Sequence, residues 1–217
     1  GELAQAEPGL DSLPIGQVRV VAGDVILTRS DGSQARAENG TPVFQGDVVE
    51  TEADASIGIV FADDTTFSLG ENGRMVLDEL VYDPDTQIGQ AVFSVVQGVF
   101  TFVSGRIANT GADSMTVQTP VANIGIRGTK VAGRAAAEGE NNTITLLADD
   151  DGSVGEIVVA NAAGVQVLSG IGQTTTVTSF FQSPPPPITL SPDQIDQQFG
   201  AALQTLSSSR VADERDG

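Results

Sequence analysis

The chain is built from short stretches in which apolar and polar residues alternate, each closed by turn-forming residues. Val18 and Val20 alternate with Gln17 and Arg19, and the residues at 57, 59 and 61 repeat the pattern. This period of two places every second side chain on one face of a strand. Turn signals recur about every eight to twelve residues, which is typical of sandwiches, barrels and rolls. The sequence predicts an all-β fold, a multi-stranded β-sandwich or β-roll of short antiparallel strands.

One stretch, AVFSVVQGVFTFV at 91–103, is apolar on both of its alternating faces. It predicts a strand buried on both sides at the centre of the domain. Gly98 within it predicts a bulge or bend. The later predicted strands are Met115–Thr119, Ile124–Ala132, Thr143–Leu147, Glu156–Ala160, Val165–Leu168 and Thr174–Thr178.

The pattern changes after the four prolines at 184–187, which favour stiff polyproline II. Ser191, Pro192 and Gln194 supply an N-cap, a proline at the first helical position and a capping-box partner. Apolar residues then recur at helical spacing. They are Ile195, Phe199, Ala202, Leu203 and Leu206. The sequence therefore predicts one C-terminal amphipathic α-helix.

These signals divide the chain into an extended lead-in (1–14), a β-domain (15–182), a Pro-rich linker (183–190), the helix (191–209) and a frayed tail (210–217). Two positions for the helix remain open. It folds back on its own sheet and shields an edge, or the stiff linker holds it away so that it docks on another subunit as an assembly arm.

Composition limits the chemistry. The net charge of −19 disfavours nucleic acid and anionic lipid as partners. Histidine and cysteine are absent, which excludes Ser-His-Asp triads, thiolate nucleophiles and zinc sites built on these residues. A glycosidase using two carboxylates is the enzymatic alternative, and the scarcity of aromatic residues disfavours it. We therefore expect that the chain is not an enzyme and requires no cofactor. No stretch of the sequence reaches the ~18 consecutive apolar residues of a membrane helix.

Three motifs occur in order along the chain. They are Gly46-Asp47-x-x-x-Thr51, then Phe61-x-Asp63, then Thr119-Pro120 followed by Arg127-Gly128-Thr129. Together they resemble the FecR domain over roughly residues 15 to 180, with Asp64 where that family has glycine. FecR proteins are best known as periplasmic regulators that relay a receptor signal towards a sigma factor. FecR-like modules also resemble parts of large surface and adhesin-type proteins, so the resemblance implies an extracytoplasmic bacterial β-domain.

Basic residues gather in one stretch of this acidic chain, at Arg106, Arg127, Lys130 and Arg134. They could meet an acidic patch on a neighbouring copy, or pair within the chain. Arg127, between two glycines in an apolar run, could bind a partner carboxylate. The alternative is that Arg127 satisfies buried carbonyls or an internal aspartate where strands cross.

Apolar contact is expected from the C-terminal region. Phe180 and Phe181 precede the prolines, and Ile195, Phe199 and Leu203 line one face of the predicted helix. Each of these groups needs an apolar surface to cover, in the same chain or in a partner.

The run Asp149-Asp150-Asp151-Gly-Ser, with Glu156 nearby, offers the hard oxygen ligands that Ca²⁺ takes. Asp149, Asp151 and Glu156 are the candidate ligands, and a solvated turn is the alternative.

The sequence thus predicts a non-catalytic extracytoplasmic structural or interaction module, secreted, at the cell surface or in the periplasm. Its expected partners are further copies of itself, as an oligomer or filament, or other surface proteins. The alternative is a periplasmic FecR-type signal-relay domain that contacts a membrane partner.

Overall fold

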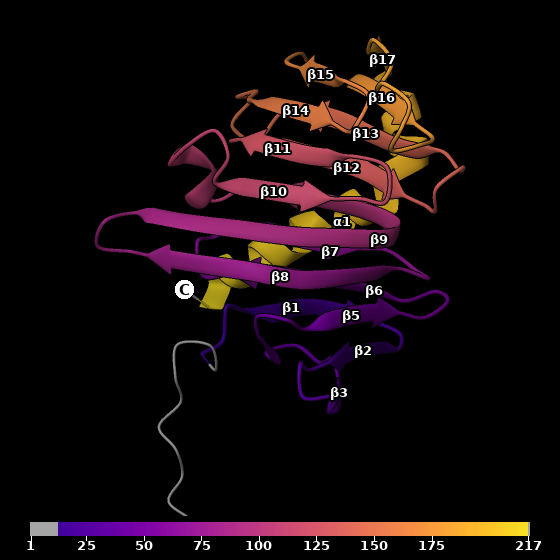
Figure 1. Ribbon diagram of the computed structural model, residues 1–217. Coiled ribbons are helices and arrows are strands. Elements are labelled where there is room, and N and C mark those ends of the chain that lie inside the picture. The colour runs from indigo at the N-terminus through magenta and orange to yellow at the C-terminus, as the bar shows by residue number, and fades with distance from the viewer. Residues whose placement is uncertain (1–12, 217) are drawn as a thin grey trace, which may run out of the picture.

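The computed structural model describes residues 13–216, which contain seventeen strands and one α-helix. Most of the predicted lead-in, residues 1–12, lies outside the described part. The strands form two layers, here called sheet A and sheet B, stacked from β3 at one end to β15 and β17 at the other (Figure 1). The helix lies behind them. The predicted all-β class with one C-terminal helix is confirmed.

Sheet A contains nine strand segments. In spatial order they are β4 (Pro42–Val43), β1 (Gly16–Ala22), β6 (Ser56–Phe61), β7 (Thr66–Leu69), the second half of β9 (Ile88–Val103), β12 (Lys130–Ala135), β13 (Asn142–Leu147), β16 (Gln173–Val177) and β17 (Ile188–Thr189).

Sheet B has the same arrangement on the other side of the core. Its order is β3 (Gln34–Arg36), β2 (Val25–Thr28), β5 (Val48–Thr51), β8 (Arg74–Asp83), the first half of β9, β10 (Met115–Gln118), β11 (Asn123–Arg127), β14 (Glu156–Ala160) and β15 (Val165–Leu168). β10 and β9 pair in parallel, whereas the other recorded pairs are antiparallel.

Strand β9 belongs to both layers and changes layer at Gly98. Before Gly98 it pairs with β8 and β10, and from Gly98 onward it pairs with β7 and β12. Gly98 has φ +108°, and a Cβ there would lie 2.9 Å from the Cα of Gly73, so glycine permits this bend. The predicted irregularity is confirmed. Burial on both faces is confirmed only for Phe100–Val103, because the outer face of sheet B leaves Val96 40% exposed.

The predicted strand Ile124–Ala132 is wrong, because the chain forms two strands there. β11 ends at Arg127 in sheet B, and β12 begins at Lys130 in sheet A. Gly128 turns the chain between the layers with φ +69°. The alternation of buried and exposed side chains conceals such a turn, since both flanking strands bury alternate residues.

The core lies between the two layers and is centred on phenylalanines. Phe61 and Phe67 of sheet A approach Phe93 of sheet B with ring centroids 4.7 and 5.9 Å apart. Phe100 and Phe102, on the second half of β9, are fully buried beside Phe67. Burying aromatic side chains of this size gives the largest hydrophobic contribution per residue.

Helix α1 (Pro192–Asp216) begins at the predicted capping box. Ser191 Oγ accepts from the Gln194 amide at 3.2 Å, and Gln194 Oε1 accepts from the Ser191 amide at 2.8 Å. The helix continues to Asp216, so the tail predicted to fray at 210–217 is helical over most of its length. Interactions of Arg210 and Asp213 with the β-domain hold this last part.

The helix covers the outer face of sheet A, and not an edge as predicted. It crosses β12, β9, β7, β6 and β1 (Figure 1). Ser68 Oγ and Thr101 Oγ1 donate to the Ala202 carbonyl at 2.9 and 3.2 Å. Both faces of β6 and β7 are therefore buried, one by sheet B and the other by α1.

The Pro-rich segment does not hold the helix away from the domain. Pro184 is buried, and Thr175 Oγ1 donates to the Pro185 carbonyl at 2.8 Å. Ile188 and Thr189 then add β17 to the edge of sheet A by pairing with β16. The assembly arm expected as one alternative is therefore not formed, since helix and linker both pack on their own chain.

Candidate functional site

The motif residues lie at turns and brace the strands. Asp47 is buried, accepts from the Phe44 amide at 2.8 Å and pairs with Arg29. Burial raises the pKa of Asp47, against the opposing effects of the Phe44 amide and Arg29. Gly46 before it has φ +88°, which suits glycine.

Thr51 and Asp63 each join two loops. Thr51 Oγ1 donates to the Gly70 carbonyl at 2.5 Å and accepts from the Gly73 amide at 2.8 Å. Asp63, fully buried, accepts from the Thr65 amide and hydroxyl at 3.1 and 2.9 Å and from the Ile107 amide at 3.1 Å. Such buried carboxylates fix turns by satisfying backbone donors.

The threonines of the third motif also fix turns through hydrogen bonds. Thr119 Oγ1 accepts from the Ala122 amide at 3.1 Å and donates to the Ala122 carbonyl at 2.9 Å, across the turn that contains Pro120. Thr129 donates through its amide to Ser104 Oγ at 2.7 Å and through its hydroxyl to the Leu147 carbonyl at 3.0 Å. These contacts hold the crossing from β11 to β12.

Arg127 lies at the surface and forms an ion pair across the strands. Its Nη1 lies 3.3 Å from Glu156 Oε1, and β11 and β14 place the two residues opposite each other. Its side chain is 47% exposed. The alternative in which Arg127 satisfies buried carbonyls or an internal aspartate is wrong.

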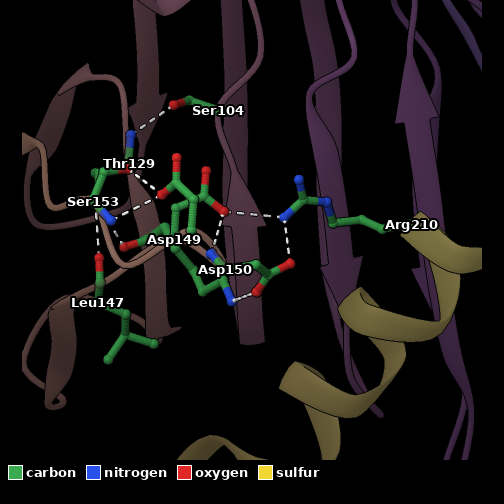
Figure 2. A network of polar contacts seen from close by, with 9 residues as sticks. Ser104, Thr129, Leu147, Asp149, Asp150, Ser153 and Arg210 are labelled. Carbon is green, nitrogen blue, oxygen red and sulfur yellow. Dashed lines mark hydrogen bonds and ion pairs between the residues drawn. The ribbon is translucent and has the colours of Figure 1, made fainter.

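The turn between β13 and β14 anchors the helix. Arg210 of α1 points at it (Figure 2) and reaches Asp149 at 3.1 Å and Asp150 at 2.8 Å. Lys130 Nζ lies 2.7 Å from the other oxygen of Asp150. The hydrogen bond from Lys130 is the main cause that lowers the pKa of Asp150. This set of four side chains is called the helix anchor below.

The three candidate calcium ligands do not converge on one point. Asp149 faces Arg210, Asp151 accepts from the Ser153 amide and hydroxyl at 2.8 and 2.5 Å, and Glu156 faces Arg127. Within residues 13–216 no group of three or more His, Cys, Asp or Glu side chains is arranged to hold a metal ion. The carboxylates have protein partners instead.

The four basic residues do not form one patch. Arg106 lies 3.3 Å from Asp64, while Lys130 and Arg127 pair as described. Arg134 is exposed, and no ion pair is recorded for it in the described part of the chain. It lines an open groove of about 1040 Å³ between the loops near 71, 98 and 139 and the first half of α1.

The predicted apolar contacts separate into two groups. Phe199 is buried under the helix, where Ile195 and Leu203 pack with it against Ala132 and Leu147. These three residues are therefore not an interaction surface, since their own sheet covers them. Phe181, by contrast, is 76% exposed and Phe180 is half-buried beside it.

One surface was not among the sequence predictions, and it is here called the end layer (residues 157–192). No Asp, Glu, Lys or Arg occurs between Glu156 and Asp193, in a chain whose net charge is −19. The end layer contains most of β14 and all of β15, β16 and β17, at the top of the stack (Figure 1). The absence of charge was visible in the sequence, but the shared location of these strands was not.

Large apolar side chains are exposed on this end layer. They are Val165 (59% exposed), Val167 (46%), Ile171 (56%), Phe181 (76%) and Ile188 (64%). Both of its outer strands are open, because β15 pairs only with β14 and β17 only with β16 among the described strands. Uncharged open edges with exposed apolar side chains are rare on monomeric proteins.

Comparison with known proteins agrees with the motifs. The family model described as FecR protein matches residues 47–154. The chain carries a FecR domain. This match includes most of the motif residues and ends beside the helix anchor, before the end layer begins.

The chain is similar to solved structures that include the following. Two crystal structures of a candidate anti-sigma factor from Parabacteroides distasonis ATCC 8503 are 14% identical, cover 71% and 70% of this FecR-domain chain and have TM-scores of 0.48 and 0.47. The chain spans 64% and 62% of their lengths. A cell surface anchoring domain is 27% identical over 29% of this chain and 82% of its own length, with a TM-score of 0.28. No curated protein sequence matches.

Membrane insertion through a helix finds no support in residues 13–216. Neither the long helix α1 nor any shorter helix there combines the length and the apolar character needed to cross a bilayer.

Proposed function

We propose that this chain is a non-catalytic module of an extracytoplasmic bacterial protein, and that it acts by binding protein through its end layer. The observation that carries the proposal is the uncharged surface between Glu156 and Asp193, with Val165, Val167 and Phe181 exposed on it. Apolar patches of this kind mark protein contacts. The FecR domain supports the extracytoplasmic location.

The motif residues support a binding role by their own arrangement. Asp47, Asp63 and Thr129 are buried and use their polar atoms to fix loops. A rigid β-scaffold of this kind suits a module that presents a surface to a partner. Lys130, which follows Thr129 of the third motif, belongs to the helix anchor. The helix anchor keeps α1 on the outer face of sheet A.

Site-specific photo-crosslinking tests this proposal. A photoreactive residue is placed at Phe181 in the bacterium that encodes the chain, with the same residue at Val81 as control. Val81 is 58% exposed on β8, away from the end layer. We expect a discrete crosslinked protein from position 181 that disappears in V165K/V167K. Equal labelling from both positions, or labelling insensitive to the lysines, contradicts the proposal.

A second candidate function is signal relay to a membrane partner, favoured by the FecR match over residues 47–154. It predicts that the crosslinked protein is a membrane protein and that V165K/V167K changes transcription that depends on a sigma factor. A structural role predicts a crosslink to a surface protein or to the chain itself, with no transcriptional effect.

A further inference from the structure

The end layer has two unpaired edge strands, β15 and β17, and they differ in the features that prevent pairing with another chain. β17 has two residues and follows the prolines at 184–187. At the opposite end of the stack, β4 also has two residues and begins with Pro42, while β3 carries Arg36, ion-paired with Asp24. Short length, proline and charge are the devices that prevent edge-to-edge pairing. Of these four outer strands, β15 alone has none of them.

Strand β15 (Val165–Leu168) has an orderly two-faced pattern. The register with β14 places Val167 opposite Val158 and Val165 opposite Ala160, on the outer face of sheet B. Gln166 and Leu168 lie opposite the buried Val159 and Ile157, on the core face. The strand thus offers an unpaired backbone edge with two exposed valines on one side.

The distribution of charge on the chain indicates which partner can bind the end layer. Two copies of a chain with net charge −19 repel each other at most orientations, and the repulsion is weakest where neither surface carries charge. The end layer meets this condition against itself. Glu138, whose carboxylate accepts from the Phe180 amide at 3.0 Å, is a charged group at its rim.

From these observations we infer that a second copy of this chain occupies β15, as an antiparallel β15–β15 pair about a two-fold axis. This inference rests on the proposed function of the end layer. Opposed residues of an antiparallel pair share a face. Centring the axis on Gln166 therefore pairs Gln166 with its counterpart and Val165 with Val167 of the other copy. Sheet B then continues from one copy into the next.

The first test is the molar mass of the full chain by light scattering over a concentration series. We expect a rise from the chain mass of 22.3 kDa towards twice that value. V165K/V167K should remain monomeric, because the lysines place like charges across the two-fold axis. V81K adds a lysine at an equally exposed valine outside the edge and should still dimerise.

The second test fixes the register. The chain has no cysteine, so Gln166→Cys introduces a single thiol. Opposed Cα atoms in an antiparallel pair are about 4.5–5.5 Å apart, within reach of a disulfide. We expect mild oxidation to give a disulfide-linked dimer from Q166C and none from V81C.

The outcomes separate this inference from the proposed function. A wild-type chain that stays monomeric at all concentrations, with no Q166C dimer, overturns β15 self-pairing. If photo-crosslinking at position 181 still captures a different protein in a lysine-sensitive manner, the proposed function stands with that partner. If crosslinking also fails, both are wrong.

Discussion

Gly58 of β6 and Ser209 of α1 meet where the helix crosses sheet A, and a Cβ added to Gly58 would lie 1.7 Å from Ser209 Oγ. Ser209 is fully buried there and donates to the Thr205 carbonyl at 2.7 Å. The helix can approach this closely because residue 58 has no side chain. Ser209 lies three residues beyond Leu206, the last residue of the predicted apolar stripe, so this contact extends the packing of the helix on sheet A towards the C-terminus.

Gly58→Ala should therefore destabilise the chain by about 1–3 kcal/mol, because the added methyl group clashes with Ser209 and pushes the helix away from sheet A. Urea unfolding measures the change. Gly125→Ala is the control, since its nearest neighbour beyond adjacent residues is 3.9 Å away. Equal losses for the two variants would show that the helix is not seated at Gly58.

Phe199→Ala should cost about 3–5 kcal/mol, because Phe199 is 2% exposed beneath α1. Phe181→Ala should change stability by less than about 0.5 kcal/mol, because Phe181 is 76% exposed. Thermal unfolding compares the two phenylalanines directly. Similar values would contradict the packing of α1 on its own sheet.

Arg210→Ala should destabilise the chain by about 1 kcal/mol, since it removes the ion pairs with Asp149 and Asp150 that are partly exposed to solvent. Hydrogen exchange should quicken most in the last turns of α1. Arg215→Ala is the matched control, because no ion pair is recorded for Arg215 in the described residues. Equal effects of the two variants, or unchanged exchange in the last turns of α1 in Arg210→Ala, would contradict the anchoring role.

Acid should weaken the helix anchor. The pKa of Asp150 is lowered from its ordinary value of 3.8, chiefly by the hydrogen bond from Lys130. The unfolded chain therefore binds this proton at a higher pH than the folded chain does. The stability that Asp150 contributes is present above 3.8 and is lost as pH falls through the lower, folded-state pKa.

The comparison of wild type with D150N isolates this effect. Wild type should be more stable by up to about 1 kcal/mol at about pH 6, and the difference should shrink as pH falls to about 3. The raised pKa of Asp47 acts in the opposite sense, since its protonation favours the folded chain. It is common to both proteins and cancels in the difference. A gap that widens in acid would contradict the assignment.

Local signals in the sequence predicted much of the fold. Strands β14 and β15 begin and end at the predicted residues, and the capping box of α1 forms as expected. These features depend on alternation and capping within a few residues. The FecR resemblance rested on motif spacing and is confirmed by the match over residues 47–154.

The sequence could not predict what depends on layers. Ser68 is polar and alternates with Phe67 and Leu69, so it looks solvent-facing, yet α1 buries it. The turn at Gly128 was not predicted because the strands on both sides bury alternate side chains, with Ile126 buried before the turn and Val131 after it. The end layer was missed because its exposed residues lie in separate segments that the topology brings together.

We propose that the end layer is a contact surface whose unpaired edge is β15. Hydrogen exchange of the full chain at low and high concentration tests this most directly. Pairing at β15 predicts that the amides of residues 165–168 exchange more slowly at high concentration, while those of β8 around Val81 do not change. Unchanged exchange at 165–168, with protection appearing at another surface, would contradict it.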